Sequence, residues 1–268
     1  MDTLTERTPR VVSAVKLLRA AERRKVGRFL AEGSNSVGEA IGTGVAVEVF
    51  FREDSEERNR RLIDLARTSG VPVHGITERA AKALSETVTP PGIVAVCTTV
   101  DVPFADAVTV GARLVAVPVE VSEPGNAGTV IRVADAMGAD SVVLLGDAVD
   151  PHNGKCVRAS AGSVFHLPIA RERSVESGIA ALRAAGLTIL ATAADGEVSL
   201  DDADELLGGP TAWLFGNEAH GLDPAVAASA DHRVSIQIRG RAESLNLATA
   251  AAICLHASAR AQHRSPRG

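Results

Sequence analysis

Residues 113–145, RLVAVPVEVSEPGNAGTVIRVADAMGADSVVLL, contain two apolar runs separated by a glycine-containing loop and a mixed segment. The first run, residues 113–119, is rich in β-branched side chains and predicts a buried strand, and residues 141–145 predict a second strand. The segment 129–137 between them predicts a helix. This order predicts one strand-helix-strand unit, and therefore parallel strands covered by helices.

The same alternation extends in both directions from this unit. Toward the C-terminus we expect a helix over 175–185, strands over 188–193, 211–215 and 233–238, and a long Ala-rich helix over 244–259. Toward the N-terminus we expect a helix over 9–29, strands over 45–51, 71–74 and 93–98, and helices over 56–69 and 77–84. The sequence therefore predicts an α/β protein with a smaller N-terminal α/β domain, residues 1–106, and a second domain, residues 107–268.

Composition excludes several classes of protein. The 268 residues are 46% hydrophobic and 23% charged, which is typical of a globular protein. The longest apolar stretches, 114–119 and 247–255, are shorter than the roughly 20 residues of a membrane span, and the N-terminus carries no signal-peptide pattern. Cys97, Cys156 and Cys254 form no CxxC pair, so no disulfide framework and no metal site are predicted. We expect a cytoplasmic protein.

The charge is unevenly distributed, although the formal net charge is −5. Residues 1–33 carry four acidic and eight basic side chains, and the basic ones are Arg7, Arg10, Lys16, Arg19, Arg23, Arg24, Lys25 and Arg28. Such a cluster can supply phosphate contacts to a nucleic acid. It is equally compatible with solvated helix faces.

The common phosphate and catalytic motifs are absent. Gly42 and Gly44 begin a GxG pattern, but Val47 stands where the third glycine of a dinucleotide-binding fingerprint belongs. The stretch around Lys155 lacks the other residues of a P-loop, and the chain contains neither HExxH nor GxSxG. These absences argue against a nucleotide-dependent metabolic enzyme of the doubly wound type.

Polar residues gather in loops that follow three predicted strands. The first loop contains Asn126 and leads to Arg132, and a helix that begins near residue 128 would bring these two side chains together at its N-terminus. The second, residues 214–222, has glycines on either side of a polar tripeptide that includes Glu218. The third, residues 236–247, contains Ser244, a possible N-cap of the last helix, and Asn246, which capping by Ser244 leaves unexplained.

These loops closely resemble the signature motifs of the SpoU (TrmH-like) branch of the SPOUT RNA methyltransferases. Pro124-Gly125-Asn126-x-Gly128 with Arg132 resembles the first motif, Gly216-Asn217-Glu218 with Gly221 the second, and Ile236 followed by Ser244-Leu245-Asn246 the third. Gln237-Ile238 stands where the family usually has Pro-Met, and His220 stands where a basic or small residue is common. The resemblance covers nearly the whole chain, including the N-terminal substrate-recognition domain of members that act on ribosomal RNA.

The resemblance implies a parallel sheet with a C-terminal trefoil knot, and transfer of a methyl group from S-adenosylmethionine to a ribose 2′-hydroxyl of RNA. It implies that Gly216, Ile236, Leu245 and Leu214 bind the cofactor, and that Arg132, Asn126, Glu218, Ser244 and Asn246 form the catalytic site. It further implies a homodimer in which the arginine of one subunit acts beside the cofactor of the other. The apolar face of residues 247–259 would contribute to that contact or pack on its own sheet.

The RNA acceptor is less specified than the reaction. The N-terminal domain resembles that of members that methylate ribosomal RNA, so we expect 23S rRNA rather than tRNA. Two alternatives remain: a tRNA 2′-O-methyltransferase, and a non-catalytic RNA-binding or ribosome-associated protein with the same fold.

Overall fold

The computed structural model describes residues 3–264 and divides the chain into two compact units. The first unit contains the residues up to Val100 and the separate segment Asp150–Phe165, and the second contains Asp101–Val149 and the residues from His166 onward. The segment Asp150–Phe165 belongs to the first unit because its helix packs on the first strand of that unit. The sequence predicts two continuous domains, 1–106 and 107–268, and does not predict that residues 150–165 join the first unit.

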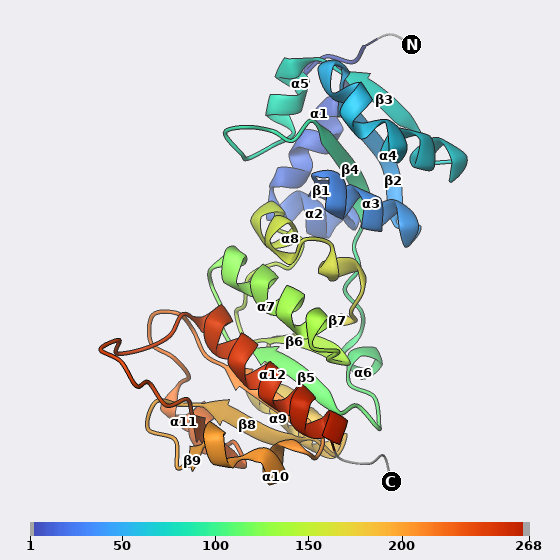
Figure 1. Ribbon diagram of the computed structural model, residues 1–268. Coiled ribbons are helices and arrows are strands. Elements are labelled where there is room, and N and C mark those ends of the chain that lie inside the picture. Colours follow the sequence, from blue (N-terminus) through green and yellow to red (C-terminus); the bar gives the residue numbers. More distant parts are fainter. Residues whose placement is uncertain (1–2, 265–268) are drawn as a thin grey trace. The chain divides into compact units, whose positions relative to one another are not determined.

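The first unit is a four-stranded sheet with helices on both faces (Figure 1). Its strand order is β1-β4-β2-β3, in which β4 runs antiparallel to both β1 and β2, whereas β2 and β3 are parallel. Helices α1 and α5 pack on one apolar cluster of the sheet, and α3 and α4 contact each other and the strands. The elements of this unit are α1 (Pro9–Val15), η1 (Lys16–Leu18), α2 (Ala20–Val26), β1 (Arg28–Glu32), α3 (Ser34–Gly42), β2 (Ala46–Arg52), η2 (Glu53–Ser55), α4 (Glu56–Thr68), β3 (Val73–Ile76), α5 (Glu78–Ala83), β4 (Ile93–Thr98), α8 (Gly154–Ser160) and η3 (Ser163–Phe165).

The prediction of one helix over 9–29 is wrong. The backbone is extended at Arg19, with φ −92° and ψ 128°, and this separates η1 from α2. Gly27 has φ +62°, a left-handed conformation that glycine adopts at little cost, and it ends α2. Phe29 therefore lies in β1, fully buried and paired with Cys97, although its spacing from Val26 matches a helix.

The second unit is a seven-stranded sheet with the order β7-β6-β5-β10-β8-β11-β9, and every strand pair in it is parallel. This confirms the predicted parallel α/β architecture. Its elements are α6 (Phe104–Ala107), β5 (Leu114–Pro118), α7 (Pro124–Ala136), β6 (Ser141–Leu145), β7 (Ile169–Glu172), α9 (Val175–Ala184), β8 (Thr188–Thr192), β9 (Val198–Ser199), η4 (Leu200–Asp202), α10 (Asp204–Leu207), β10 (Thr211–Phe215), α11 (Pro224–Ala228), β11 (His232–Ser235) and α12 (Leu247–Arg264).

The two faces of this sheet are covered by different helices. Val115 and Val117 of β5 and Leu214 of β10 join Ile179 and Leu182 of α9 in one buried cluster. Trp213, the neighbour of Leu214, points to the opposite face, because side chains alternate along a strand. Its indole Nε1 donates a hydrogen bond of 2.8 Å to Ser258 Oγ of α12. Helix α12 also packs against α7, so these two helices together cover that face.

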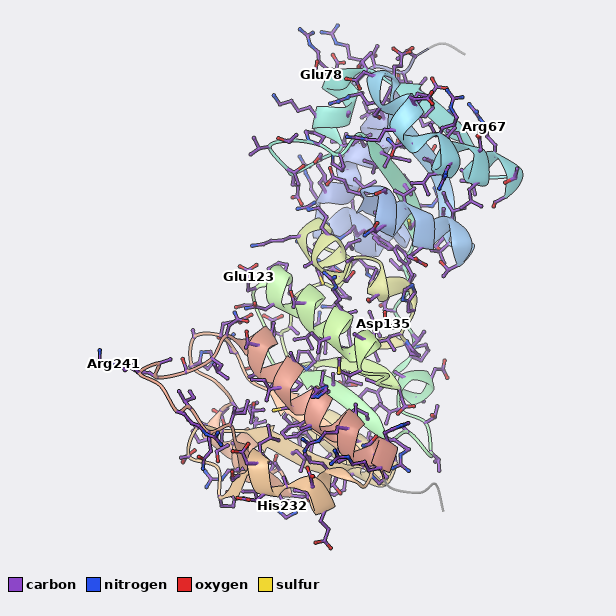
Figure 2. All side chains as sticks on the ribbon, viewed as in Figure 1. Arg67, Glu78, Glu123, Asp135, His232 and Arg241 are labelled. Atoms are coloured by element: carbon purple, nitrogen blue, oxygen red, sulfur yellow. The ribbon has the colours of Figure 1, made fainter. Side chains whose placement is uncertain are left out.

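Helix α7 begins at Pro124, five residues before the predicted start at 129, and Glu123 and Asp135 lie near its two ends (Figure 2). Proline is favoured at the first helical position, and the Glu123 side chain accepts a hydrogen bond of 3.1 Å from the Gly125 amide. Asn126 is therefore a residue of the first turn. Arg132 follows it by six residues, about 9 Å along the helix axis, so the expected convergence of the two side chains does not occur.

Helix α12 is capped by Asn246 rather than by Ser244. The Asn246 Oδ1 atom accepts hydrogen bonds from the amides of Ala248 (2.9 Å) and Thr249 (3.4 Å). The buried side of the helix, which includes Ala251, Cys254 and Leu255, packs within its own unit. Of the two expectations for residues 247–259, the structure thus shows packing on the chain's own sheet. Within residues 3–264, no helix is both long and apolar enough to cross a membrane.

Two of the N-terminal basic residues are engaged inside the first unit. Arg23 is buried, with 4% of its side chain exposed, and its Nη2 atom lies 2.7 Å from Asp150 Oδ2. Arg10 forms an ion pair of 2.7 Å with Glu48. Arg23 is therefore a structural residue, whereas Arg7, Lys16, Arg19, Arg24, Lys25 and Arg28 are exposed.

Candidate functional site

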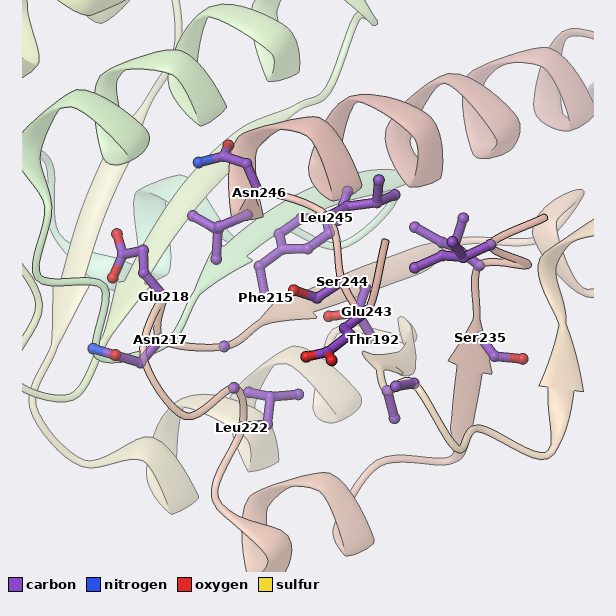
Figure 3. A pocket seen from close by; sticks show the side chains of 18 of the residues that line it. Thr192, Phe215, Asn217, Glu218, Leu222, Ser235, Glu243, Ser244, Leu245 and Asn246 are labelled. Atoms are coloured by element: carbon purple, nitrogen blue, oxygen red, sulfur yellow. The ribbon is translucent and has the colours of Figure 1, made fainter. Parts of the chain in front are cut away.

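A pocket of about 780 Å³ lies at the carboxyl ends of β8, β10 and β11 (Figure 3). This volume is typical of sites for small molecules, and the carboxyl end of a parallel sheet is where α/β proteins bind ligands. The lining combines the loop after β10 with the irregular chain between β11 and α12. Six of the nine expected site residues line it: Gly216, Glu218, Ile236, Ser244, Leu245 and Asn246.

Three expected site residues from separate loops form one hydrogen-bonded chain. Asn126 Nδ2 of α7 donates to Glu218 Oε1 over 3.1 Å, and Asn246 Nδ2 donates to Asn126 Oδ1 over 3.2 Å. Both polar atoms of the Asn126 amide are thus used within the protein. Because Asn246 also caps α12, the network fixes the first turns of two helices to the loop that carries Glu218.

Glu218 is held in its ionised form. Partial burial raises the pKa of its carboxyl, but the hydrogen bond from Asn126 and those from main-chain amides, including Ser122 and Glu123, outweigh this effect, so the pKa lies below its ordinary value. The Ser122 amide and hydroxyl each lie 3.3 Å from Oε2, and the Glu123 amide lies 3.2 Å from Oε1. A carboxylate that accepts this many donors acts as a fixed acceptor at the start of α7.

The loop after β10 folds back so that Gly216 lies against the main chain of Gly221 and Leu222. Asn217 exchanges two main-chain hydrogen bonds with Gly221, of 2.9 and 2.8 Å. A Cβ atom at position 216 would lie 2.2 Å from the Gly221 carbonyl carbon and from the Leu222 nitrogen, so only glycine fits there. The Asn217 side chain donates a 2.7 Å hydrogen bond to the carbonyl of Glu120, which has the unusual φ of +52°.

Residues 236–246 line the pocket with main chain as well as with side chains. This segment has no helix or strand, and the main-chain N–H groups of residues 237–245 form no hydrogen bond with any residue in the described range 3–264. Arg241 lies at the outer end of this segment (Figure 2). The unpaired amides near Leu245 and Ile238 are available to a ligand.

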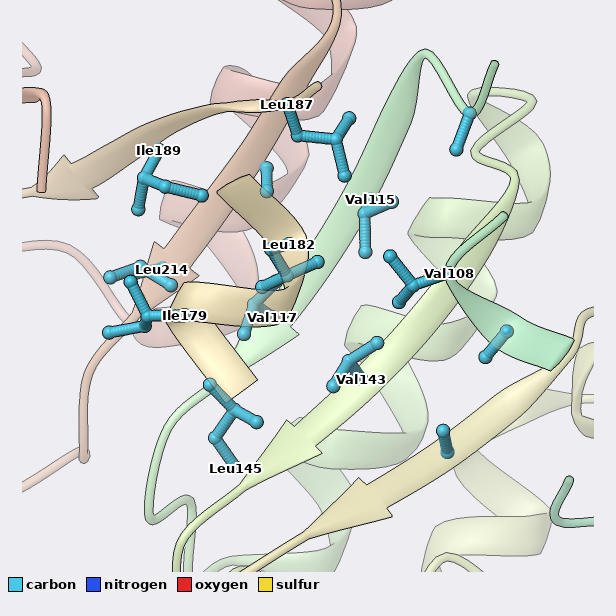
Figure 4. Close-up of a cluster of buried hydrophobic side chains, with 14 of the residues drawn as sticks. Val108, Val115, Val117, Val143, Leu145, Ile179, Leu182, Leu187, Ile189 and Leu214 are labelled. Atoms are coloured by element: carbon cyan, nitrogen blue, oxygen red, sulfur yellow. The ribbon is translucent and has the colours of Figure 1, made fainter. Parts of the chain in front are cut away.

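Three expected site residues are absent from the pocket lining: Leu214, Arg132 and Asn126, of which Asn126 hydrogen-bonds to the lining residues Glu218 and Asn246. Leu214 is fully buried in the cluster that also contains Val117 and Leu182, on the face covered by α9 (Figure 4). Arg132 is exposed on α7, and no hydrogen bond or ion pair joins its side chain to another residue within 3–264. Ser244, by contrast, lines the pocket with its side chain exposed.

The structure adds site residues that the sequence reasoning missed. Thr192, at the end of β8, lines the pocket and donates a 3.1 Å hydrogen bond to the Leu214 carbonyl. Glu243 lines it from the segment before α12, and Ser122 holds Glu218. Position at the end of a predicted central strand is the one signal that pointed to Thr192, because the residues after it carry no glycine-bracketed polar motif.

Comparison with known proteins identifies the family of this chain. Residues 113–256 match the model of the SpoU rRNA Methylase family, and residues 8–95 match that of the MRM3-like substrate binding domain. The chain is 36% identical to a 23S rRNA (guanosine(2553)-2′-O)-methyltransferase of Bacillus subtilis, over 90% of this chain and 92% of that protein. It is 33% identical to a 23S rRNA (uridine(2479)-2′-O)-methyltransferase of Streptomyces viridochromogenes, over 89% and 85% of the two chains.

A solved structure with the same architecture supports this assignment. The AdoMet-bound rRNA methyltransferase from Sinorhizobium meliloti is 30% identical to this chain and covers 99% of both chains with a TM-score of 0.84. These matches confirm the resemblance drawn from the three loop motifs. The chain therefore belongs to the SpoU rRNA methylase family, whose members are S-adenosylmethionine-dependent RNA methyltransferases.

Proposed function

We propose that this chain transfers a methyl group from S-adenosylmethionine to a ribose 2′-hydroxyl of 23S ribosomal RNA. The observation that carries the proposal is the Asn246–Asn126–Glu218 network, which joins all three family motifs at the edge of one pocket. A protein that only binds RNA has no need for this arrangement. The two relatives named above act on 23S rRNA at different nucleotides, so the target nucleotide is left open.

The pocket fits S-adenosylmethionine. Its volume suits a ligand of this size, Leu222, Val234 and Leu247 offer apolar contacts, and the unpaired main-chain amides offer donors. Gly216, Ile236 and Leu245 would hold the cofactor, and Leu214 would support it by fixing β10 from the core. S-adenosylmethionine supplies an electrophilic methyl group on a sulfonium centre. The trefoil knot expected for the family would form where residues 236–246 pass back toward α12.

The attacking group is a weakly acidic hydroxyl, so the protein must orient it and stabilise the negative charge that develops on its oxygen as its proton passes to water, and S-adenosylhomocysteine would be the leaving group. Arg132 is suited to the second task, because a guanidinium stays protonated in proteins and binds phosphate and alkoxide oxygens. Glu218 and Asn126 position the start of α7, and Ser244 and Asn246 hydrogen-bond the nucleotide or the cofactor at the pocket rim.

A homodimer would complete the site. Arg132 is exposed, unpaired within residues 3–264 and absent from the lining of the chain's own pocket. We therefore assign Arg132 of one subunit to the pocket of the other. Mixing inactive Arg132→Ala protein with inactive Leu245→Glu protein should then restore about a quarter of the wild-type activity, because half of the dimers are mixed and each has one intact site. Absence of recovery, with subunit exchange verified, contradicts the shared site.

The two domains have different roles, in line with the two family models that match them. Residues 1–106 would bind the RNA substrate, with the exposed basic residues of α1 to β1 providing salt-dependent affinity, and residues 107–268 would carry out the transfer. A steep fall of RNA affinity with salt, reduced by Lys16→Ala and Arg19→Ala, is the expected result of a binding titration.

The proposal is tested by transfer of a labelled methyl group from S-adenosylmethionine to unmodified total RNA, separated into ribosomal and transfer fractions. We expect label in 23S rRNA with the wild type, and none with Arg132→Ala, whose cofactor binding by calorimetry stays at the wild-type level. Label in tRNA alone would overturn the choice of substrate. Cofactor binding without label in any fraction would favour an assembly intermediate as acceptor, and no cofactor binding would favour a non-catalytic RNA-binding protein.

A further inference from the structure

The first unit contains a second hollow, which the transfer reaction does not use. It has a volume of about 380 Å³ and is lined by Ser13, Ala14, Leu17, Val26, Arg28, Glu48 and Val96. Its floor consists of the apolar side chains of Ala14, Leu17 and Val96, which are 3%, 5% and 2% exposed. Val26 forms part of its wall with 48% of its surface exposed, which is high for a large aliphatic side chain.

Two opposite charges face this hollow with free hydrogen-bonding atoms. Glu48 Oε2 accepts a 2.7 Å hydrogen bond from Arg10, and His74 Nε2 lies 3.6 Å from the same oxygen. The other oxygen, Oε1, accepts no hydrogen bond from residues 3–264, although only 13% of the Glu48 side chain is exposed. Arg28 is exposed, and its side chain forms no ion pair or hydrogen bond within the described part of the chain. The hollow therefore offers a carboxylate oxygen of Glu48 as acceptor and the guanidinium of Arg28 as donor, above an apolar floor.

The surrounding charge indicates a polyanion. The elements that line the hollow, from α1 to β1, also carry the exposed side chains of Lys16, Arg19, Arg24 and Lys25. A hydrocarbon chain or an apolar peptide side chain would leave the Arg28 guanidinium and the Glu48 oxygen unpaired. A nucleobase satisfies all three features, since it has an apolar face, N–H donors and ring or carbonyl acceptors, and its phosphates suit the basic surroundings.

Guanine matches the pair of charged groups best. Its N1–H and N2–H₂ groups donate to a carboxylate, and its O6 and N7 atoms accept from an arginine fork. Proteins that recognise RNA sequence usually do so through unpaired bases, which can leave the stack and enter a pocket. We propose that this hollow binds one unpaired guanine of the substrate RNA; the proposal rests on the RNA methyltransferase function above and specifies how the first unit recognises its substrate.

The test compares two valine variants with the same change of charge. Val26→Glu places an acid at the wall of the hollow, whereas Val12→Glu places it on α1, at a position that is 39% exposed and outside the lining. Both side chains are exposed enough that the fold should persist, which thermal unfolding verifies. Binding of an unmodified 23S rRNA transcript should weaken about tenfold more with Val26→Glu than with Val12→Glu, because the apolar contacts and hydrogen bonds of the base are lost in addition to the effect of the charge.

Modification interference identifies the base directly. The 23S transcript is lightly treated with kethoxal, which modifies N1 and N2 of unpaired guanines, and bound and free RNA are separated with each protein. We expect one guanine whose modification is excluded from the RNA bound by wild type and by Val12→Glu, and is tolerated by Val26→Glu. Equal weakening by both variants, or no such guanine, overturns the inference while methyl transfer persists. Failure of the wild type to bind or methylate 23S rRNA would instead overturn the proposed function, and the inference with it.

Discussion

Asn126 Nδ2 donates a 3.1 Å hydrogen bond to Glu218 Oε1, which connects the first turn of α7 to the loop after β10 across 92 residues of sequence. The same amide accepts a 3.2 Å hydrogen bond from Asn246 through Oδ1. An asparagine provides one donor and one acceptor on a single planar group. Neither aspartate nor a hydrophobic residue of similar size can replace both interactions. The asparagine at position 126 is therefore required to connect the first motif to Glu218 of the second and Asn246 of the third.

Asn126→Asp should greatly impair methyl transfer. It replaces a donor by a carboxylate within hydrogen-bonding distance of Glu218, and the two negative charges repel each other. We expect the transfer rate to fall about 10- to 100-fold, the usual effect of losing a hydrogen bond to a charged group. Ser122→Ala is the matched control, because it removes one donor at 3.3 Å and keeps the main-chain amide. Equal rates for wild type and Asn126→Asp would contradict a role for the network.

Gly216→Ala should disrupt the cofactor pocket. The new methyl group would lie 2.2 Å from the main chain of Gly221 and Leu222, so one of the two segments must move. We expect a loss of about 3 kcal/mol in unfolding free energy, together with cofactor affinity at least about tenfold lower. Gly240→Ala, where a Cβ meets nothing within 4 Å, should preserve both properties. Calorimetric titration with S-adenosylmethionine that gave identical affinities for the two variants would refute this description of the loop.

The buried Arg23–Asp150 pair predicts a pH-dependent stability. Burial raises the pKa of the Asp150 carboxyl, but hydrogen bonds from His152 and Arg23, together with the Arg23 charge, lower the pKa by more than burial raises it. The pKa therefore lies well below its ordinary value of 3.8. A lowered pKa stabilises the fold at pH values above 3.8, and this contribution is lost as the pH falls toward the folded-state value. Asp150→Asn should therefore cost a constant free energy from roughly pH 5 to 7, and less below about pH 4.

The arginine partner provides the matched comparison for this pair. Arg23→Met leaves Asp150 without its cation and should cost about 3 kcal/mol, whereas Arg24→Met, at the exposed neighbouring position, should cost less than about 0.5 kcal/mol. Urea unfolding at several pH values measures both quantities. A stability difference between wild type and Asp150→Asn that stayed unchanged into acid would be inconsistent with the lowered pKa.

Ser258→Ala should destabilise the second unit. It leaves the buried Trp213 Nε1–H without an acceptor, at an expected cost of about 1–3 kcal/mol. Thr249→Ala, on the exposed side of the same helix, should change stability by less than about 0.5 kcal/mol. If denaturant unfolding gave similar losses for the two variants, the hydrogen bond between β10 and α12 would not contribute as described.

The regular elements of the fold were predictable because their buried runs are continuous in sequence. Strands β4, β6 and β10 have the predicted bounds, since each is an apolar run that ends at a polar or glycine-containing segment. Helix starts were less predictable. Pro124-Gly125 reads as a turn, yet proline at the first helical position and the Glu123 side chain begin α7 there. Likewise, a local pattern does not indicate whether Ser244 or Asn246 caps α12.

The sequence predicted which loops contribute to the site, but it did not predict how their side chains are arranged. The sequence placed Asn126, Glu218 and Asn246 in three loops, but their hydrogen bonds depend on the order of β5, β10 and β11 in the sheet, which local patterns do not determine. The expected meeting of Asn126 and Arg132 assumed a helix start near residue 128. The true start at Pro124 separates them, and it leaves Arg132 exposed on the surface of its own unit.

We propose that this chain methylates a ribose of 23S rRNA. Partial alkaline cleavage of an unmodified 23S transcript, mapped nucleotide by nucleotide after incubation with the protein and S-adenosylmethionine, tests this reaction. A 2′-O-methyl group blocks cleavage at the 3′ side of its nucleotide, so we predict one new resistant position with the wild type and none with Arg132→Ala. A cleavage pattern identical to that of untreated RNA, although the wild type binds both cofactor and transcript, would contradict methylation of 23S rRNA by this chain.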